Sequence, residues 1–340
     1  MVGGDDGSLR AREEHFAAAP GEHVAHPSPF STLFPHLHHS KTHQFRLALL
    51  VGLGVVIALA SFGLVAGALL SAMVIVPTLY IVYIFESRVY GGEPVAVLGT
   101  TVGGGVILGA VVAWVFHQML GNTTGDDIGP LVILTIAAPV VQVAVVAIPA
   151  LILRKRCGGA VVDGLVFGVA AGLGFATGES LVRFLPVFSV LSTRSSSLGW
   201  LYALTSVAVL VPLMHGAVAG AISAAVWRPV RNSHTAWLQM MTIPVVLLAS
   251  IGFSLGGQLI QQYGGAQMLI AAWQVVMAAT VLIFIRYLVH HILLQDLAGI
   301  PMHAATCPHC NHHAMCGGFC PRCGAALTAD VVQPAAGVSA

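Results

Sequence analysis

The sequence predicts an all-α polytopic membrane protein. Two observations lead to this fold class. Hydrophobic residues make up 57% of the 340 residues and charged residues only 8%, whereas soluble domains contain about 25% charged residues. The apolar residues are also grouped in blocks of about 20, the length of a helix that crosses the hydrocarbon core of a bilayer. The short alternating segments that are typical of a β-barrel are not seen.

The apolar blocks predict about eight transmembrane helices within residues 45–296. The run from Phe45 to Phe85 is long enough for two spans, with a turn expected around Gly63–Ser71. The other six spans are expected at Val95–Met119, Pro130–Leu153, residues 160–184, Gly199–Trp227, Trp237–Ile260 and Met268–Leu294.

The two ends of the chain are polar, and we expect residues 1–44 and 328–340 to be disordered tails. The first tail is rich in histidine, and a solvated juxtamembrane segment is the favoured interpretation. The alternative is a loose transition-metal site. Its histidines would be His36, His38, His39 and His43.

The basic residues predict the orientation of the bundle, because cytoplasmic loops carry an excess of lysine and arginine. With the N-terminus inside, eight spans leave only Arg183 and Arg194 outside, where Asp126 and Asp127 also lie. Both termini are therefore expected in the cytoplasm. The net charge of +1 gives no support for a nucleic-acid partner. The inside set comprises Lys41, Arg46, Arg88, Arg154, Lys155, Arg156, Arg228 and Arg231.

A cysteine-rich segment at residues 303–327 predicts a small zinc ribbon after the bundle. Two CPxC pairs, Cys307/Cys310 and Cys320/Cys323, are separated by nine residues. Four thiolates at this spacing can complete a tetrahedral zinc site, and the zinc then supplies folding energy that so short a segment lacks. Four protein ligands leave no open position, so the expected role is structural or for partner contact. The alternative ligands are Cys316, His309, His312 and His313.

The span at residues 160–184 carries two charges, Glu179 and Arg183. A charge within a membrane helix costs about 2.5–3.5 kcal/mol on insertion scales, which makes it a candidate for function. The two residues are four apart and can form a pair on one helix face. The functional alternative is that Glu179 faces the bundle interior and works with His215 of the sixth span, as a base or as part of a metal site.

The string DGLVFGVAAGLGFATGESL, from Asp163 to Leu181, resembles the signature helix of the PrsW family of intramembrane proteases. Phe175 and Glu179 match the Phe-x-x-x-Glu motif of that family, and His215 matches its histidine motif. The resemblance covers roughly residues 75–230. It implies an integral protein of a bacterial plasma membrane that cleaves membrane-anchored proteins, such as an anti-sigma factor.

The first motif of the family is lost in this sequence. Ala138-Pro139 fits the approach to an acidic pair, but Gln142 and Val143 occupy the positions of the pair and Val146 that of the basic residue. The resemblance implies that the missing carboxylates would activate the attacking water. Gln142 can form hydrogen bonds but cannot take a proton near neutral pH.

Three functions remain open at this point. The first is an intramembrane peptidase with full or impaired activity, in which Glu179 is the base or a ligand, His215 a ligand or electrophilic partner, and Gln142 positions the substrate. The second is an inactive pseudoprotease that acts as a membrane binding or scaffold protein through its zinc ribbon. A transporter or channel is disfavoured, because we find one charged helix rather than two related ones. A second metal, within the membrane site, remains an alternative to the ribbon zinc alone.

Overall fold

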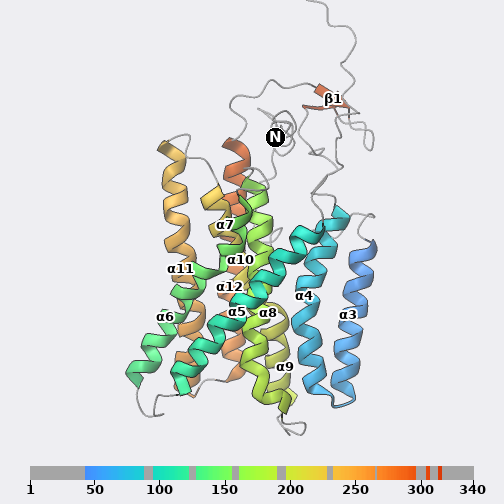
Figure 1. The fold of residues 1–340 in the computed structure, drawn as a ribbon, viewed down its shortest axis with the longest axis vertical. Coiled ribbons are helices and arrows are strands. Elements are labelled where there is room, and N and C mark those ends of the chain that lie inside the picture. The colour runs from blue at the N-terminus through green and yellow to red at the C-terminus, as the bar shows by residue number, and fades with distance from the viewer. Residues whose placement is uncertain are drawn as a thin grey trace, which may run out of the picture. The chain divides into compact units, whose positions relative to one another are not determined.

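The computed structural model describes residues 43–87, 95–121, 128–154, 161–189, 197–227, 233–264 and 266–295, with two short strands at 304–306 and 313–315. The chain divides into two compact units, one formed by residues 33–282 and the other by residues 1–32 and 283–340. Figure 1 shows the fold. The first unit contains most of the helical bundle and is described first.

The predicted number of spans is confirmed, because eight helical segments in the described part of the chain are long and apolar enough to cross a membrane. Two of these spans are interrupted helices. The helices are α3 (His43–Ser61), α4 (Val65–Ser87), α5 (Val95–Gly121), α6 (Ile128–Val146), α7 (Ile148–Arg154), α8 (Val161–Ser189), α9 (Ser197–Thr205), the π-helix η1 (Ser206–Leu210), α10 (Val211–Trp227), α11 (Ser233–Gln262) and α12 (Gln267–Gln295).

The turn between the first two spans lies earlier than predicted. The helix α3 ends at Ser61 and α4 begins at Val65, so most of the predicted turn, Gly63–Ser71, is helical. The turn is fixed by Gly63, whose φ of 75° is in the left-handed region that glycine adopts without strain. Gly63 was inside the predicted range, but the apolar residues after it gave no sign that the next helix starts at once.

The fourth span is divided into α6 and α7 at Ala147. Pro149 lies at the start of α7, where the proline ring is tolerated, but it provides no backbone N–H for a bond to the preceding turn. The sixth span runs from α9 through η1 into α10. A π-helical turn is rare and is often found at functional sites.

The helix α8 is the centre of the bundle. Its span is 78% buried, as is the span that contains α10, whereas each of the other six is 33% buried or less. Figure 1 shows α5 crossing α8 at a slant, and glycines allow this close approach. A Cβ atom on Gly178 would lie 2.0 Å from the carbonyl oxygen of Val106 on α5, and one on Gly172 would lie 2.3 Å from that of His215 on α10.

The second unit includes, besides the end of α12, a small antiparallel sheet. Strand β1 (Ala304–Thr306) pairs with β2 (His313–Met315), with Thr306 opposite His313. This hairpin falls within the predicted zinc ribbon at residues 303–327. The predicted zinc ligands Cys307, Cys310, Cys320 and Cys323, the alternative ligand Cys316, and the tails 1–42 and 328–340 lie outside the described residues.

Candidate functional site

Glu179 on α8 is buried, with only 6% of its surface exposed. The guanidinium of Arg183, one turn further along the same helix, donates a hydrogen bond of 2.8 Å from Nη2 to the Glu179 Oε1 atom. The Arg183 side chain itself is 61% exposed. The pair expected from the i, i+4 spacing is therefore formed, and it binds only one of the two carboxylate oxygens.

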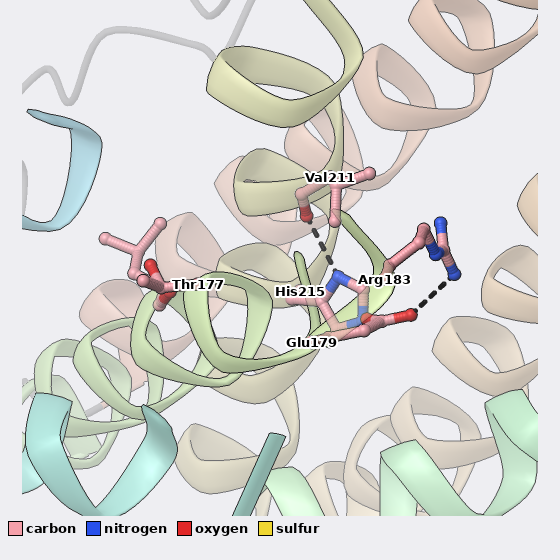
Figure 2. A network of polar contacts seen from close by, with 6 residues as sticks. Thr177, Glu179, Arg183, Val211 and His215 are labelled. Carbon is pink, nitrogen blue, oxygen red and sulfur yellow. Dashed lines mark hydrogen bonds and ion pairs between the residues drawn. The ribbon is translucent and has the colours of Figure 1, made fainter. Parts of the chain in front are cut away.

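The second carboxylate oxygen faces His215. Its Oε2 atom lies 3.0 Å from His215 Nε2 on α10. Figure 2 shows Glu179 between the imidazole and the guanidinium. The pair within α8 and the contact with His215 were alternatives in the sequence, and the structure contains both because each uses a different oxygen atom.

The His215 ring is held on two sides. Its Nδ1 atom lies 2.9 Å from the backbone carbonyl oxygen of Val211, at the point where η1 passes into α10 (Figure 2). Phe175, which is fully buried, stacks on the imidazole with 5.5 Å between ring centroids and 21° between ring planes. The Phe-x-x-x-Glu spacing thus places the stacking ring and the carboxylate one helical turn apart on the same face.

The Val211 contact determines which nitrogen of His215 carries a proton. A carbonyl oxygen can only accept, so Nδ1 donates and Nε2 is the nitrogen that faces Glu179. Nε2 and Oε2 are both buried, and neither has an aligned hydrogen bond, although they are close. Two lone pairs at this distance repel each other, so the contact requires a positive charge, from a proton or a cation, between the two atoms.

These residues do not fit a complete catalytic metal site. Catalytic zinc is usually held by three protein ligands, and among the described residues no group of three histidine, cysteine, aspartate or glutamate side chains is close enough to hold an ion. Glu179 and His215 supply two donors. The position where a further carboxylate would be expected is Gln142, which lines the same cavity as Glu179.

Of the residues at the positions of the first motif, one lines the cavity and two are buried in the core. Gln142 lines the same cavity as Glu179 and His215. Val143 and Val146 are instead buried, 8% and 2% exposed, and Val146 belongs to the apolar cluster around Phe175. Whether Gln142 takes part in function stays a prediction. Another carboxylate that could replace the lost pair is Glu86, near the end of α4. Its side chain lies outside the part of the chain that is described in atomic detail.

A cavity of about 460 Å³ adjoins the pair and gives it room for a ligand. Its wall includes polar side chains from α6, α11 and α12 that were not predicted: Thr135, Ser250, Ser254, Gln258, Gln261 and Gln274. A possible signal was the presence of glutamine in otherwise apolar spans, since polar residues in membrane helices usually face the bundle interior.

Fold and site together define a polytopic membrane protein with a carboxylate–imidazole pair buried beside a cavity. The family model of the PrsW family intramembrane metalloproteases matches residues 93–289, which include Gln142, Glu179 and His215. The match covers more than half of the chain, and the chain belongs to this family. No curated protein and no solved structure matches the chain.

Proposed function

We propose that the protein is an intramembrane peptidase that acts on membrane-anchored proteins, with Glu179 as its base. The observation that supports this most is the buried contact of 3.0 Å between Glu179 Oε2 and His215 Nε2 beside the cavity. A carboxylate and an imidazole in hydrogen-bonding range are the usual components of general acid–base catalysis. Family membership supports the same reaction class.

The proposed reaction needs only one water molecule and a peptide bond. Glu179 takes a proton from the water, whose oxygen attacks the carbonyl carbon. In this mechanism His215 is protonated at both nitrogens, and the positive charge of its imidazolium stabilises the negative charge that develops on the carbonyl oxygen. The C–N bond then breaks, and the proton passes from Glu179 to the leaving nitrogen, giving a carboxyl and an amine. Gln142 holds the substrate by hydrogen bonds. Because the donor set is one ligand short of a catalytic zinc site, no step is assigned to a metal.

The test is cleavage of a membrane-anchored substrate by the purified full-length protein in lipid nanodiscs. Glu179→Gln keeps the size of the side chain and removes the base, so we expect cleavage to fall by at least 100-fold, in line with the usual contribution of about 10²–10⁴. The matched control is Gln262→Leu, an exposed residue of α11 outside the cavity. Unchanged cleavage by Glu179→Gln would exclude the proposed role.

A second candidate function is supported by the identity of Gln142 and Val143. Neither side chain can act as a base, and Val143 is buried among apolar residues. In this alternative the bundle binds membrane segments without cleaving them and recruits partners through the ribbon. A partner whose crosslinking depends on Cys307–Cys323 and persists in Glu179→Gln would support it. Persistence of the same partner with Cys320→Ser would exclude a role for the ribbon.

We also propose that Cys307, Cys310, Cys320 and Cys323 hold a structural zinc ion in the cytoplasm. The hairpin supports this, because the first CPxC pair follows β1 directly in the sequence and β2 begins at His313. A cytoplasmic tail fits free thiolates, which a reducing compartment preserves. The even number of spans supports the proposal that both termini are in the cytoplasm.

A further inference from the structure

The cavity has a second polar wall, formed by residues that are not part of the family motifs. Thr135 on α6, Gln258 on α11 and Gln274 on α12 line it. The Thr135 hydroxyl donates a hydrogen bond to the Gln258 Oε1 atom, which joins α6 to α11. None of these side chains takes part in the proposed acid–base steps. Uncharged polar groups inside apolar spans are costly unless they bind something.

Gln274 places a buried acceptor on this wall. Only 9% of its surface is exposed, and its amide oxygen is buried with no hydrogen-bond donor among the described residues. The amide lies beside Gly257 of α11, where a Cβ atom would be 4.0 Å from Gln274 Nε2. A buried carbonyl oxygen in a cavity, without a donor, is an acceptor available to a ligand.

The second wall belongs to the same cavity as the Glu179–His215 pair. Thr135, Gln258 and Gln274 line this cavity together with Glu179 and His215. A ligand that fills the cavity can therefore reach both walls.

We propose that Gln274, with Gln258 and Thr135, forms a subsite for the peptide backbone of an unwound transmembrane segment. The inference rests on the proposed function, because it places such a segment beside Glu179. An intact helix uses its backbone N–H groups internally, so it has no donor for Gln274 Oε1. An unwound stretch exposes both N–H and C=O groups, and a carboxamide can pair with both.

The kind of ligand can be inferred from Gln274 Oε1, which needs a hydrogen-bond donor. In the hydrocarbon region every backbone N–H must be satisfied, so a peptide that unwinds there requires acceptors on the protein. Gln274 Oε1 supplies one, and Gln258 and Thr135 supply further polar groups on neighbouring helices. The subsite would therefore select segments that unwind easily, rather than segments of a particular side-chain type.

The experiment compares two fluorescent synthetic peptides in nanodiscs that contain the full-length Glu179→Gln protein, in which bound peptide is not cleaved. One peptide is an uninterrupted leucine–alanine transmembrane helix, and the other has the same length with a central Asn-Pro-Gly. We expect Gln274→Leu to weaken binding of the interrupted peptide at least fivefold, as loss of about one hydrogen bond predicts. Binding of the uninterrupted helix should not change.

Two further variants control for folding. Gln274→Met keeps the length of the side chain without the amide, and it should reproduce the effect of Gln274→Leu at an unchanged thermal unfolding midpoint. Gln262→Leu makes the same change on an exposed residue outside the cavity, and it should affect neither peptide. Equal affinities of Gln274→Met and its parent for the interrupted peptide would overturn the proposal, as would failure of the parent to bind that peptide.

Cleavage of the interrupted peptide by protein with Glu179 intact separates this inference from the proposed function. Binding that depends on Gln274 without any cleavage would leave the subsite in place and contradict the peptidase. Cleavage that is unaffected by Gln274→Met, with unaffected binding, would support the peptidase and overturn the subsite.

Discussion

Phe175 and His215 lie on different helices, and their rings stack with centroids 5.5 Å apart. Phe175 is fully buried on α8, one turn before Glu179, so one helix supplies both the carboxylate that faces the imidazole and the ring that supports it. In the proposed mechanism, the phenylalanine of the Phe-x-x-x-Glu motif would therefore be a positioning residue that orients His215 without touching the reacting atoms.

Replacing Phe175 by leucine should lower both the rate of cleavage and the thermal unfolding midpoint. The aliphatic side chain fills part of the space but cannot stack on the imidazole, a contribution of about 0.5–1.5 kcal/mol for aromatic pairs. We expect cleavage to fall by about tenfold, with a further decrease in the unfolding midpoint from the smaller side chain. Phe62→Leu is the control, because Phe62 is 81% exposed. Equal cleavage by the two variants would show that stacking does not matter.

The approach of α8 to α10 can be tested with Gly172→Ala. The added methyl group would lie 2.3 Å from the His215 carbonyl oxygen and 2.8 Å from the Gly216 Cα atom, so the helices must move apart. Such overpacking costs about 1–3 kcal/mol. We expect a lower thermal unfolding midpoint and loss of cleavage. Gly99→Ala on α5 meets nothing within 4 Å, and it should be neutral or slightly stabilising. Similar midpoints for both variants would contradict the predicted contact.

Arg183→Gln should have a smaller effect than Glu179→Gln. The Arg183 side chain is 61% exposed, and exposed ion pairs contribute about 0–1 kcal/mol. Its loss frees Glu179 Oε1 but leaves the Oε2 contact with His215 in place. We expect cleavage to fall several-fold at most, measured on the same substrate at saturating concentration. A decrease as large as that of Glu179→Gln would mean that Arg183 itself contacts the substrate.

Gln142→Glu should increase cleavage if the bundle is an impaired peptidase. The residue lines the cavity beside Glu179, so the change returns one carboxylate to the first motif. We expect at least a tenfold gain, which is modest against the usual contribution of about 10²–10⁴ for general acid–base catalysis. Val143→Glu is the contrasting variant and should destabilise the protein, because Val143 is only 8% exposed. No gain with Gln142→Glu would favour the pseudoprotease.

Metal analysis of the purified protein should find one zinc ion per chain. The two CPxC pairs of the tail supply four thiolates, whereas the described residues of the bundle lack a group of three metal-binding side chains. Removing residues 303–340 should remove the zinc, and Cys320→Ser should weaken its retention against a chelator. A zinc ion that remains after this deletion would show that the bundle binds a metal as well.

The sequence predicted most of the bundle, because the length of an apolar span depends on bilayer thickness alone. Interruptions at Ala147 and at η1 were not predicted, since local breaks leave the apolar composition unchanged. Glu179 and His215 could be found because charge is rare in a membrane helix. Gln274 could not be singled out from the sequence. Its amide oxygen is buried without a hydrogen-bond donor among the described residues, and this can be seen only once the helices are packed.

The glycine contacts of α8 also limit how a substrate can enter. The backbone of α8 meets α5 and α10 directly at Gly178 and Gly172, so these three helices cannot separate without breaking the contacts that set the spacing of Glu179 and His215. A substrate of the proposed peptidase would therefore have to reach Glu179 without separating α5, α8 and α10 from one another.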